Sequence, residues 1–146
     1  MVELASVRSR IGEKMQDRYL FRAKRIDNGE WAKGFLIKPR IGNYTNIVED
    51  PEVKGEHADV YEIDKSTICQ CTGLKDKNGK LIWENDIIEC KLGKAVVIWD
   101  KYEWKIKWLD DLVWRRDVHC WATDNNGKIK IIGNRFDNPE LLEVQE

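Results

Sequence analysis

The sequence predicts a mainly β protein, built as a small antiparallel barrel or sandwich. Three observations lead to this fold class: short stretches in which apolar and polar residues alternate, turn residues every few positions, and almost no apolar pattern with helical spacing. Many short strands joined by short turns are typical of barrels and sandwiches. The 146 residues are enough for one domain with a single modest core.

The first strand signals surround an Asn-Gly turn. Residues 19–26 (YLFRAKRI) alternate in polarity, Asn28-Gly29 follows, and residues 31–37 (WAKGFLI) form the returning strand. We therefore predict an N-terminal β-hairpin. Residues 1–14 show no strong period, so we expect a poorly ordered or helical N-terminal extension before a single β domain over residues 15–146.

The middle of the chain predicts a long loop and then a series of strands. Residues 38–58 hold two prolines, two glycines and many acidic residues, which indicates an acidic loop. Strand patterns resume at residue 59, and a second Asn-Gly turn lies in KDKNGK at 75–80. After it come the short stretches LIW, DIIECKL, KAVVIWD and YEWKIKWL. We expect them to be successive strands of a barrel core over about residues 72–134.

The C-terminal end predicts one short helix. In DNPELLEVQE, Asn138 is suited to the N-cap and Pro139 to the first helical position. A third Asn-Gly turn, within residues 124–128, comes before the last strand signal.

The stretch YEWKIKWL raises a choice between a core strand and a surface for stacking bases. Alternation puts Trp104, Ile106 and Trp108 on one face, and Glu103, Lys105 and Lys107 on the other. A stacking surface needs cations and aromatic rings on the same face. The separation therefore favours a half-buried strand with a solvated back.

Seven tryptophans are many for one small core, so some should line an interface. Trp114 and Trp121 lie in the less regular stretch LVWRRDVHCW, together with two arginines. Tryptophan and arginine are enriched at interface hot spots. We predict an interaction surface there and a homo-oligomer, dimer or trimer; the candidate residues are Trp114, Arg115, Arg116 and Trp121.

Charge and hydropathy narrow the function classes. Lys plus Arg is 25 and Asp plus Glu is 26, which argues against a dedicated nucleic-acid-binding protein. A nucleic-acid-associated accessory protein stays open as an alternative, through the basic residues Arg18, Arg22, Lys24, Arg25, Lys105, Lys107, Arg115 and Arg116. No apolar run of membrane-spanning length and no signal-peptide core is present, so we expect a cytoplasmic protein without membrane contact.

The sequence offers no motif for catalysis, a cofactor or a metal. It has no phosphate-binding glycine loop, no HExxH and no G-x-S-x-G. Cys69 and Cys71 form C-x-C rather than a zinc-type C-x-x-C, and we expect buried, reduced thiols, although His57 and His119 would complete a metal site if folding brought them close. We expect no catalytic, cofactor-binding or metal-binding residues; an enzyme of unknown type is the third alternative, because a carboxylate pair leaves no local signature.

Three motifs in order along the chain resemble the YopX family of phage and prophage proteins of Gram-positive bacteria. CTGLKDKNGKLIWENDIIEC is similar to the family pattern TGLxDKNGKxIYEGDIV, with Trp83 in place of Tyr and Asn85 in place of Gly. FRAKRIDNGEWAKGFLI resembles the family's N-terminal hairpin, and IIGNRFDNPELL resembles its C-terminal motif. If position 85 is left-handed, Asn is the least costly replacement for Gly.

The resemblance implies an SH3-like small barrel with extra elements, in a bacterial host cell. It implies no reaction, so no site residue is carried over from it. The leading hypothesis is a non-catalytic protein-interaction module that self-associates or binds a host or phage protein.

Overall fold

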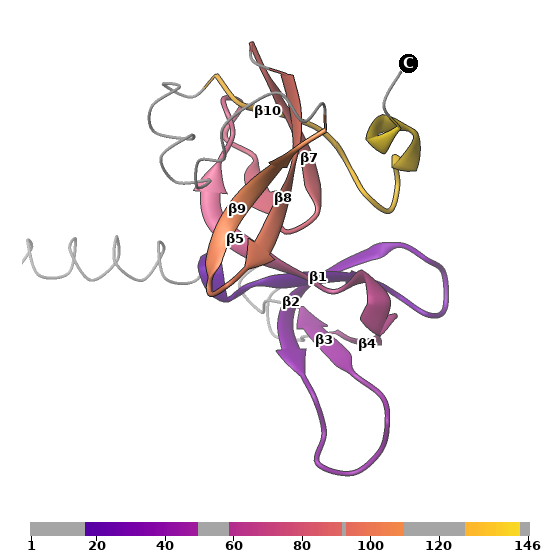
Figure 1. Cartoon of the computed structure of the whole chain (residues 1–146). Coiled ribbons are helices and arrows are strands. Elements are labelled where there is room, and N and C mark those ends of the chain that lie inside the picture. The colour runs from indigo at the N-terminus through magenta and orange to yellow at the C-terminus, as the bar shows by residue number, and fades with distance from the viewer. Residues whose placement is uncertain (1–16, 50–58, 92, 110–127, 144–146) are drawn as a thin grey trace, which may run out of the picture. The chain divides into compact units, whose positions relative to one another are not determined.

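The computed structural model describes residues 17–49, 59–91, 93–109 and 128–143 (Figure 1). These residues form ten β-strands and two short 3-10 helices, so the prediction of a mainly β protein is confirmed. The chain divides into two compact units, residues 1–71 and 72–146. The N-terminal extension predicted for residues 1–14 lies outside the described residues.

The first unit is built from a hairpin that continues into a larger antiparallel sheet. The predicted hairpin is present: β1 (Phe21–Lys24) pairs with β2 (Trp31–Ile37), and Gly29 adopts the positive φ of 72° that its turn requires. The sheet has the order β4-β3-β2-β1-β5-β6. Its other strands in this unit are β3 (Asn46–Glu49), β4 (Val60–Glu62) and the start of β5 (Cys69–Lys75), with the 3-10 helix η1 (Lys65–Thr67) before β5.

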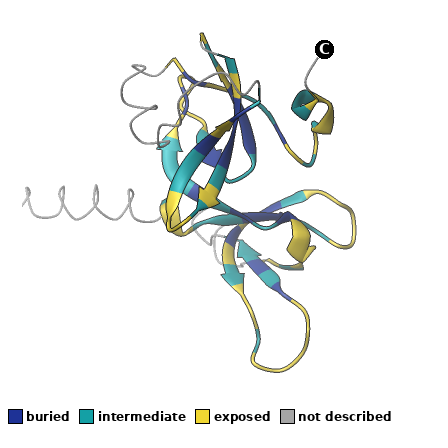
Figure 2. Cartoon of the chain, in the orientation of Figure 1, coloured by how far each residue is buried: buried dark blue, intermediate teal, exposed yellow. Residues whose placement is uncertain are grey.

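The prediction of one acidic loop over residues 38–58 is wrong at residues 46–49, and its last part, residues 50–58, lies outside the described residues. Residues 46–49 form β3, in which Ile47 is fully buried and belongs to the core. The connection from β2 to β3 is almost wholly exposed (Figure 2) and carries Lys38 and Arg40 but no acidic residue. The two prolines and two glycines suggested one long loop, but Asn-Ile-Val-Glu forms a strand because β2 offers a partner on which Ile47 is buried.

A small apolar core lies on one face of this sheet. Ala23, Ala32, Ile47 and Ile63 are buried together. Two alanines face each other across β1 and β2, so the strands leave little room for large side chains at this point. A single bridge, Arg25 to Ile63, links the residue after β1 to the residue after β4.

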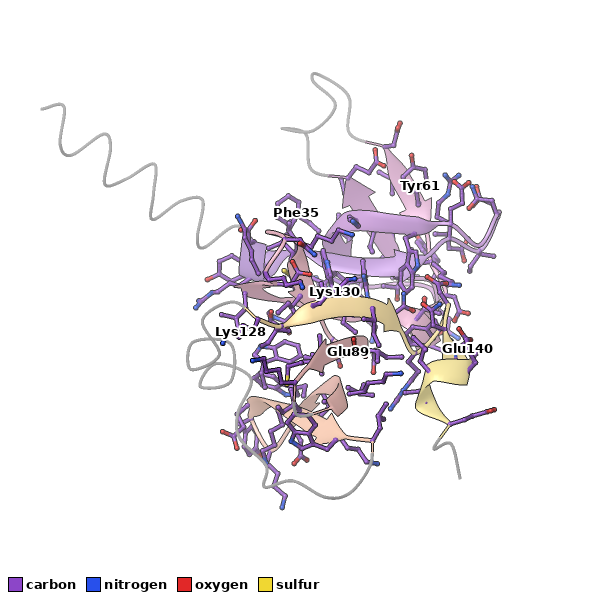
Figure 3. All side chains as sticks on the ribbon, turned by 90° about the horizontal axis from the view of Figure 1, so that it is seen from above. Phe35, Tyr61, Glu89, Lys128, Lys130 and Glu140 are labelled. Atoms are coloured by element: carbon purple, nitrogen blue, oxygen red, sulfur yellow. The ribbon has the colours of Figure 1, made fainter. Side chains whose placement is uncertain are left out.

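The second unit confirms the predicted succession of strands. β7 (Asp86–Cys90), β8 (Gly93–Asp100) and β9 (Glu103–Trp108) pair antiparallel in sequence order. β10 (Lys130–Asn134) pairs with the other side of β7, with Lys130 opposite Glu89 (Figure 3). The short β6 (Leu81–Trp83) follows the turn after β5, where Gly79 has φ 78° at the predicted second Asn-Gly turn.

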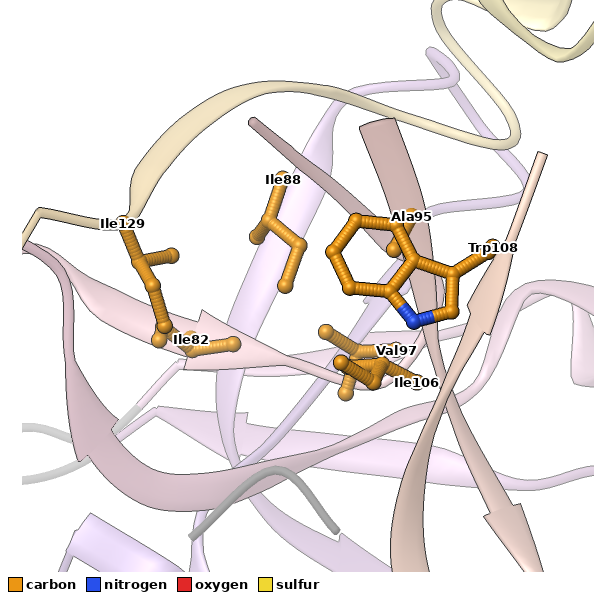
Figure 4. Packing of buried hydrophobic residues seen from close by; sticks show 7 residues of the cluster. All are labelled: Ile82, Ile88, Ala95, Val97, Ile106, Trp108 and Ile129. Atoms are coloured by element: carbon orange, nitrogen blue, oxygen red, sulfur yellow. The ribbon is translucent and has the colours of Figure 1, made fainter. Parts of the chain in front are cut away.

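The larger core lies in this unit. It contains Ile82, Ile88, Ala95, Val97, Ile106, Trp108 and Ile129, all buried (Figure 4). β-Branched side chains dominate it, as is usual for side chains that pack on a pleated sheet.

The barrel prediction is wrong for the described strands, because neither sheet closes. The four-stranded sheet has the order β10-β7-β8-β9, so β10 and β9 are its two ends; the six-stranded sheet ends at β4 and β6. A barrel needs its first and last strands to pair. Periodicity shows which face of a strand is buried, but not which strands become neighbours.

The predicted C-terminal helix is a single 3-10 turn, η2 (Pro139–Leu142). Pro139 occupies its first position as expected. Asn138 stands at the N-cap position but makes no side-chain cap; its Oδ1 instead accepts a hydrogen bond from the Asn134 N–H at 3.2 Å. Within the described residues, no helix has the length and apolar character needed to cross a membrane.

Candidate interaction surfaces

The interaction residues predicted from sequence lie outside the described residues. Trp114, Arg115, Arg116 and Trp121 fall within residues 110–127, outside the part of the chain that the structure describes. The same holds for His57 and His119. Cys69 and Cys71 are both buried, as expected, and the Cys69 thiol donates to the carbonyl oxygen of Thr67 at 3.3 Å. Over the described residues, no cluster of three or more His, Cys, Asp or Glu side chains could hold a metal ion.

Strand β9 has the two faces that the alternation predicts. Ile106 and Trp108 are buried, and Trp104 is half-buried against the same core. Lys107 is exposed on the back. Lys105 is held by Asp100 at 3.0 Å and Glu103 at 3.3 Å, and the Asp100 hydrogen bond, followed by that of Glu103, raises the pKa of Lys105 although partial desolvation lowers it. Lys105 is therefore paired with acidic residues, and the rings of Trp104 and Trp108 lie on the opposite face of β9, so the back face does not combine cations with rings.

The tip of the β8–β9 hairpin carries an exposed aromatic group that sequence reasoning missed. Trp99 is 50% exposed and contacts Trp104 edge to face, with ring centroids 5.0 Å apart. Tyr102 is 94% exposed. We call Trp99, Tyr102 and Trp104 the hairpin tip.

The turn at the hairpin tip has an unusual backbone. Asp100 pairs with Glu103, so Lys101 and Tyr102 form a two-residue turn, and both have positive φ, 48° and 70°. Turns of this kind strongly prefer Asn-Gly, because most side chains are disfavoured at positive φ. The signal in the sequence was the tight turn in WDKYEW without a glycine or asparagine.

In the first unit, cationic side chains lie over aromatic rings. Arg22 and Lys24 of β1 lie over the ring of Trp31, with the Arg22 Cζ 4.7 Å and the Lys24 Nζ 5.5 Å from its centroid. Arg25 lies over Tyr61 at 4.0 Å, and its Nε also donates to Asp27 at 2.9 Å. Arg18 lies over Tyr19 at 4.9 Å. Four of the basic residues named in the nucleic-acid alternative are thus paired with rings.

A hollow of about 550 Å³ opens beside the end of β1. Its lining mixes Lys24, Arg25 and Lys65 with the acidic Glu62 and Asp64. Lys65 donates to the Asn43 backbone oxygen and side chain, and the Asp64 carboxylate accepts from the backbone and hydroxyl of Ser66, bonds that lower its pKa. Because the lining contains both positive and negative side chains, it does not favour the binding of either an anion or a cation.

The polar side chains of the DKNGK segment build its turn. Asp76 is only 6% exposed; its Oδ1 accepts hydrogen bonds from the N–H groups of Asn78 at 2.8 Å and Lys80 at 2.9 Å. Its Oδ2 accepts from the Ile131 N–H at 3.1 Å and so joins the turn to β10. Burial raises the pKa of Asp76, but these three hydrogen bonds outweigh it and the net pKa is lowered.

Side chains of the WEND and IGN segments also accept hydrogen bonds from nearby backbone N–H groups. The buried Asp86 accepts from the Trp83 N–H at 2.8 Å, around Asn85 with φ 67°, so the left-handed conformation considered for position 85 is present. Asn134 accepts from the N–H groups of Phe136 and Asp137. Gly133 leaves room for Asn138, because a Cβ there would lie 2.4 Å from the Asn138 Oδ1.

The family model described as YopX protein matches residues 20–143. The chain belongs to the YopX family. This is a phage-associated family to which no function is assigned. The resemblance implied a fold more than an activity, and the polar side chains of these motifs build turns in this chain. No curated protein matches the chain.

Proposed function

We propose that this YopX protein is a non-catalytic protein-interaction module that self-associates through the hairpin tip. The observation that carries the proposal is the positive φ of Lys101 and Tyr102, because neither residue type is suited to that conformation. The side chain of Tyr102 is also 94% exposed. Each such residue costs about 1–2 kcal/mol of stability. The exposed tyrosine gives little packing energy in return, so its presence is better explained by a contact outside the fold.

The chemistry of the hairpin tip suits a protein surface. Tyrosine and tryptophan bury much area with few rotatable bonds and are common at interface hot spots. Trp99 is preoriented by its edge-to-face contact with Trp104. Exposed aromatic groups of this kind on a small domain otherwise favour aggregation.

The charges around the hairpin tip favour a second copy of the chain as its binding partner. Around the tip, Asp100 and Glu103 are acidic and Lys101 and Lys105 are basic, so the local charge is balanced. Two copies that meet here encounter no net repulsion, and a two-fold contact uses the same patch twice. A strongly charged tip would instead have favoured a partner of opposite charge.

Two further observations support a role without catalysis. The carboxylate of Asp76 and the amide of Asn134 are engaged by backbone hydrogen bonds, so these motif side chains serve the fold. The hollow in the first unit has opposed charges. Neither arrangement presents an acid–base pair to a substrate.

The test replaces the turn with the sequence that its backbone prefers. The double variant Lys101→Asn/Tyr102→Gly removes the exposed tyrosine and relieves the backbone, so its melting temperature should stay equal or rise. Sedimentation equilibrium at tens of micromolar should show an oligomer for the wild type and a monomer for the variant. Val60→Ser, which alters another exposed apolar side chain, is the matched control and should leave the oligomer intact.

The results separate association from stability. A wild type that sediments as a monomer would overturn the proposal. So would a double variant that is folded and still forms the oligomer, because the contact would then lie elsewhere.

A further inference from the structure

The pairing of β1 with β2 collects cations and aromatic rings on one face of the first sheet. Lys24 pairs with Trp31, and Arg22 pairs with Lys33. Side chains of paired residues point to the same face, and so do residues two apart in a strand. Phe35 therefore joins them, while Ala23 and Ala32 face the core on the other side. We call Arg22, Lys24, Trp31, Lys33 and Phe35 the β1–β2 face.

The geometry of the β1–β2 face matches a surface for unpaired bases. Trp31 and Phe35 are four residues apart along β2, about 14 Å, with Lys33 between them. Phe35, labelled in Figure 3, is 37% exposed, Lys33 is exposed and Trp31 is half-buried. Arg22 lies over the Trp31 ring and fixes it from the β1 side.

The two strands that form this face carry only positive charge, although the acidic Glu62 and Asp64 lie beside Lys24 in the hollow. Neither β1 nor β2 contains an acidic residue, and residues 31–48 contain no Asp or Glu at all. This stretch adds Lys38 and Arg40 on the exposed connection to β3. The net charge of the whole chain, −1, conceals this local excess. On β9 the alternation separates rings from cations, whereas on β1 and β2 they lie together.

We propose that the β1–β2 face binds single-stranded nucleic acid without sequence preference. One base stacks on Phe35 and a second on the accessible part of Trp31, while Lys24 and Lys33 contact the phosphates beside them. Stacking tolerates every base because each has a π-face. A duplex hides the faces of its bases, so it lacks the stacking contribution.

The two proposed phosphate contacts, from Lys24 and Lys33, determine the binding affinity that we expect. The dissociation constant should lie at about 10⁻⁴–10⁻⁶ M near physiological salt. Each phosphate contact on a single strand contributes about −0.7 to the slope of log K against log salt, so the slope should be about −1.4.

The experiment measures the fluorescence anisotropy of a labelled oligothymidine as full-length protein is added, over a range of salt concentrations. Phe35→Ser should weaken binding about tenfold through lost stacking. Lys33→Glu should weaken it by a similar factor and bring the salt slope closer to zero, by about 0.7. Lys107→Glu, an exposed lysine on β9, is the matched control and should leave both unchanged. Urea unfolding of each variant confirms that it is folded.

Several outcomes would overturn the inference. No anisotropy change at about 100 μM protein in low salt would do so, as would equal losses for Lys33→Glu and Lys107→Glu, which indicate diffuse charge. A duplex bound as tightly as the single strand would exclude stacking. If Phe35→Ser instead dissociates an oligomer and leaves the anisotropy unchanged, the β1–β2 face is a protein contact.

Discussion

The carboxylate of Asp76 and the backbone N–H of Ile131 are joined by a 3.1 Å hydrogen bond across 55 residues of sequence. The same carboxylate closes its own turn through Asn78 and Lys80. One buried side chain therefore sets the shape of the DKNGK turn and places the start of β10.

Replacing the Asp76 carboxylate should lower the stability of the folded protein. In Asp76→Asn one acceptor oxygen becomes an NH₂ donor, so at least one of the three backbone N–H groups loses its partner. We expect the free energy of unfolding to fall by about 1–3 kcal/mol, measured by urea denaturation. Glu89→Gln, an exposed carboxylate on β7, is the control and should change little. Equal effects of the two variants would contradict the role given to Asp76.

The lowered pKa of Asp76 predicts a dependence of stability on acid. In the unfolded chain this carboxyl titrates near pH 3.9, and in the folded protein it titrates lower. Between the folded and the unfolded pKa, the unfolded state binds more protons than the folded state. The stability that the Asp76 carboxylate contributes is therefore fully present above the unfolded pKa, and it is lost as the pH falls through the folded pKa.

The pH dependence of the stability that Asp76 contributes can be measured directly. Protonated Asp76 resembles Asn, so the gap in unfolding free energy between wild type and Asp76→Asn should be largest near about pH 6 and should shrink towards about pH 2.5. A gap that stays constant over this range would show that the charge of Asp76 contributes nothing.

Two glycines of the first unit should respond differently to alanine. A Cβ on Gly34 would lie 1.9 Å from the backbone oxygen of Val48, and a backbone atom in a paired strand cannot rotate away. Gly34→Ala should therefore destabilise by about 3 kcal/mol and disturb the β2–β3 pairing.

Gly29 provides the comparison. It has φ 72° but no atom within 4 Å of an added Cβ, so Gly29→Ala should cost only the conformational term, about 1 kcal/mol. Thermal or urea unfolding of both variants checks the order. A Gly34→Ala variant no less stable than Gly29→Ala would mean that the two strands separate easily at this point.

The sequence by itself determined the local features of this YopX protein. It predicted the hairpin around Asn28-Gly29, the turn at Asn78-Gly79, the succession β7, β8, β9, and the inward face of Trp104, Ile106 and Trp108. These follow from turn chemistry and from a period of two, which act between residues close in the chain. The motifs likewise identified the family.

The tertiary structure decided which distant segments become neighbours. The pairing of β7 with β10, the bond from Asp76 to Ile131 and the open ends of both sheets depend on how whole strands pack and on the cost of closing long loops. The candidate sites show the same division. Every residue of the β1–β2 face was visible in the sequence, but only the register of Lys24 with Trp31 puts the cations beside the ring. The exposure of Tyr102 likewise depends on a turn conformation that its sequence disfavours and that the pairing of Asp100 with Glu103 imposes.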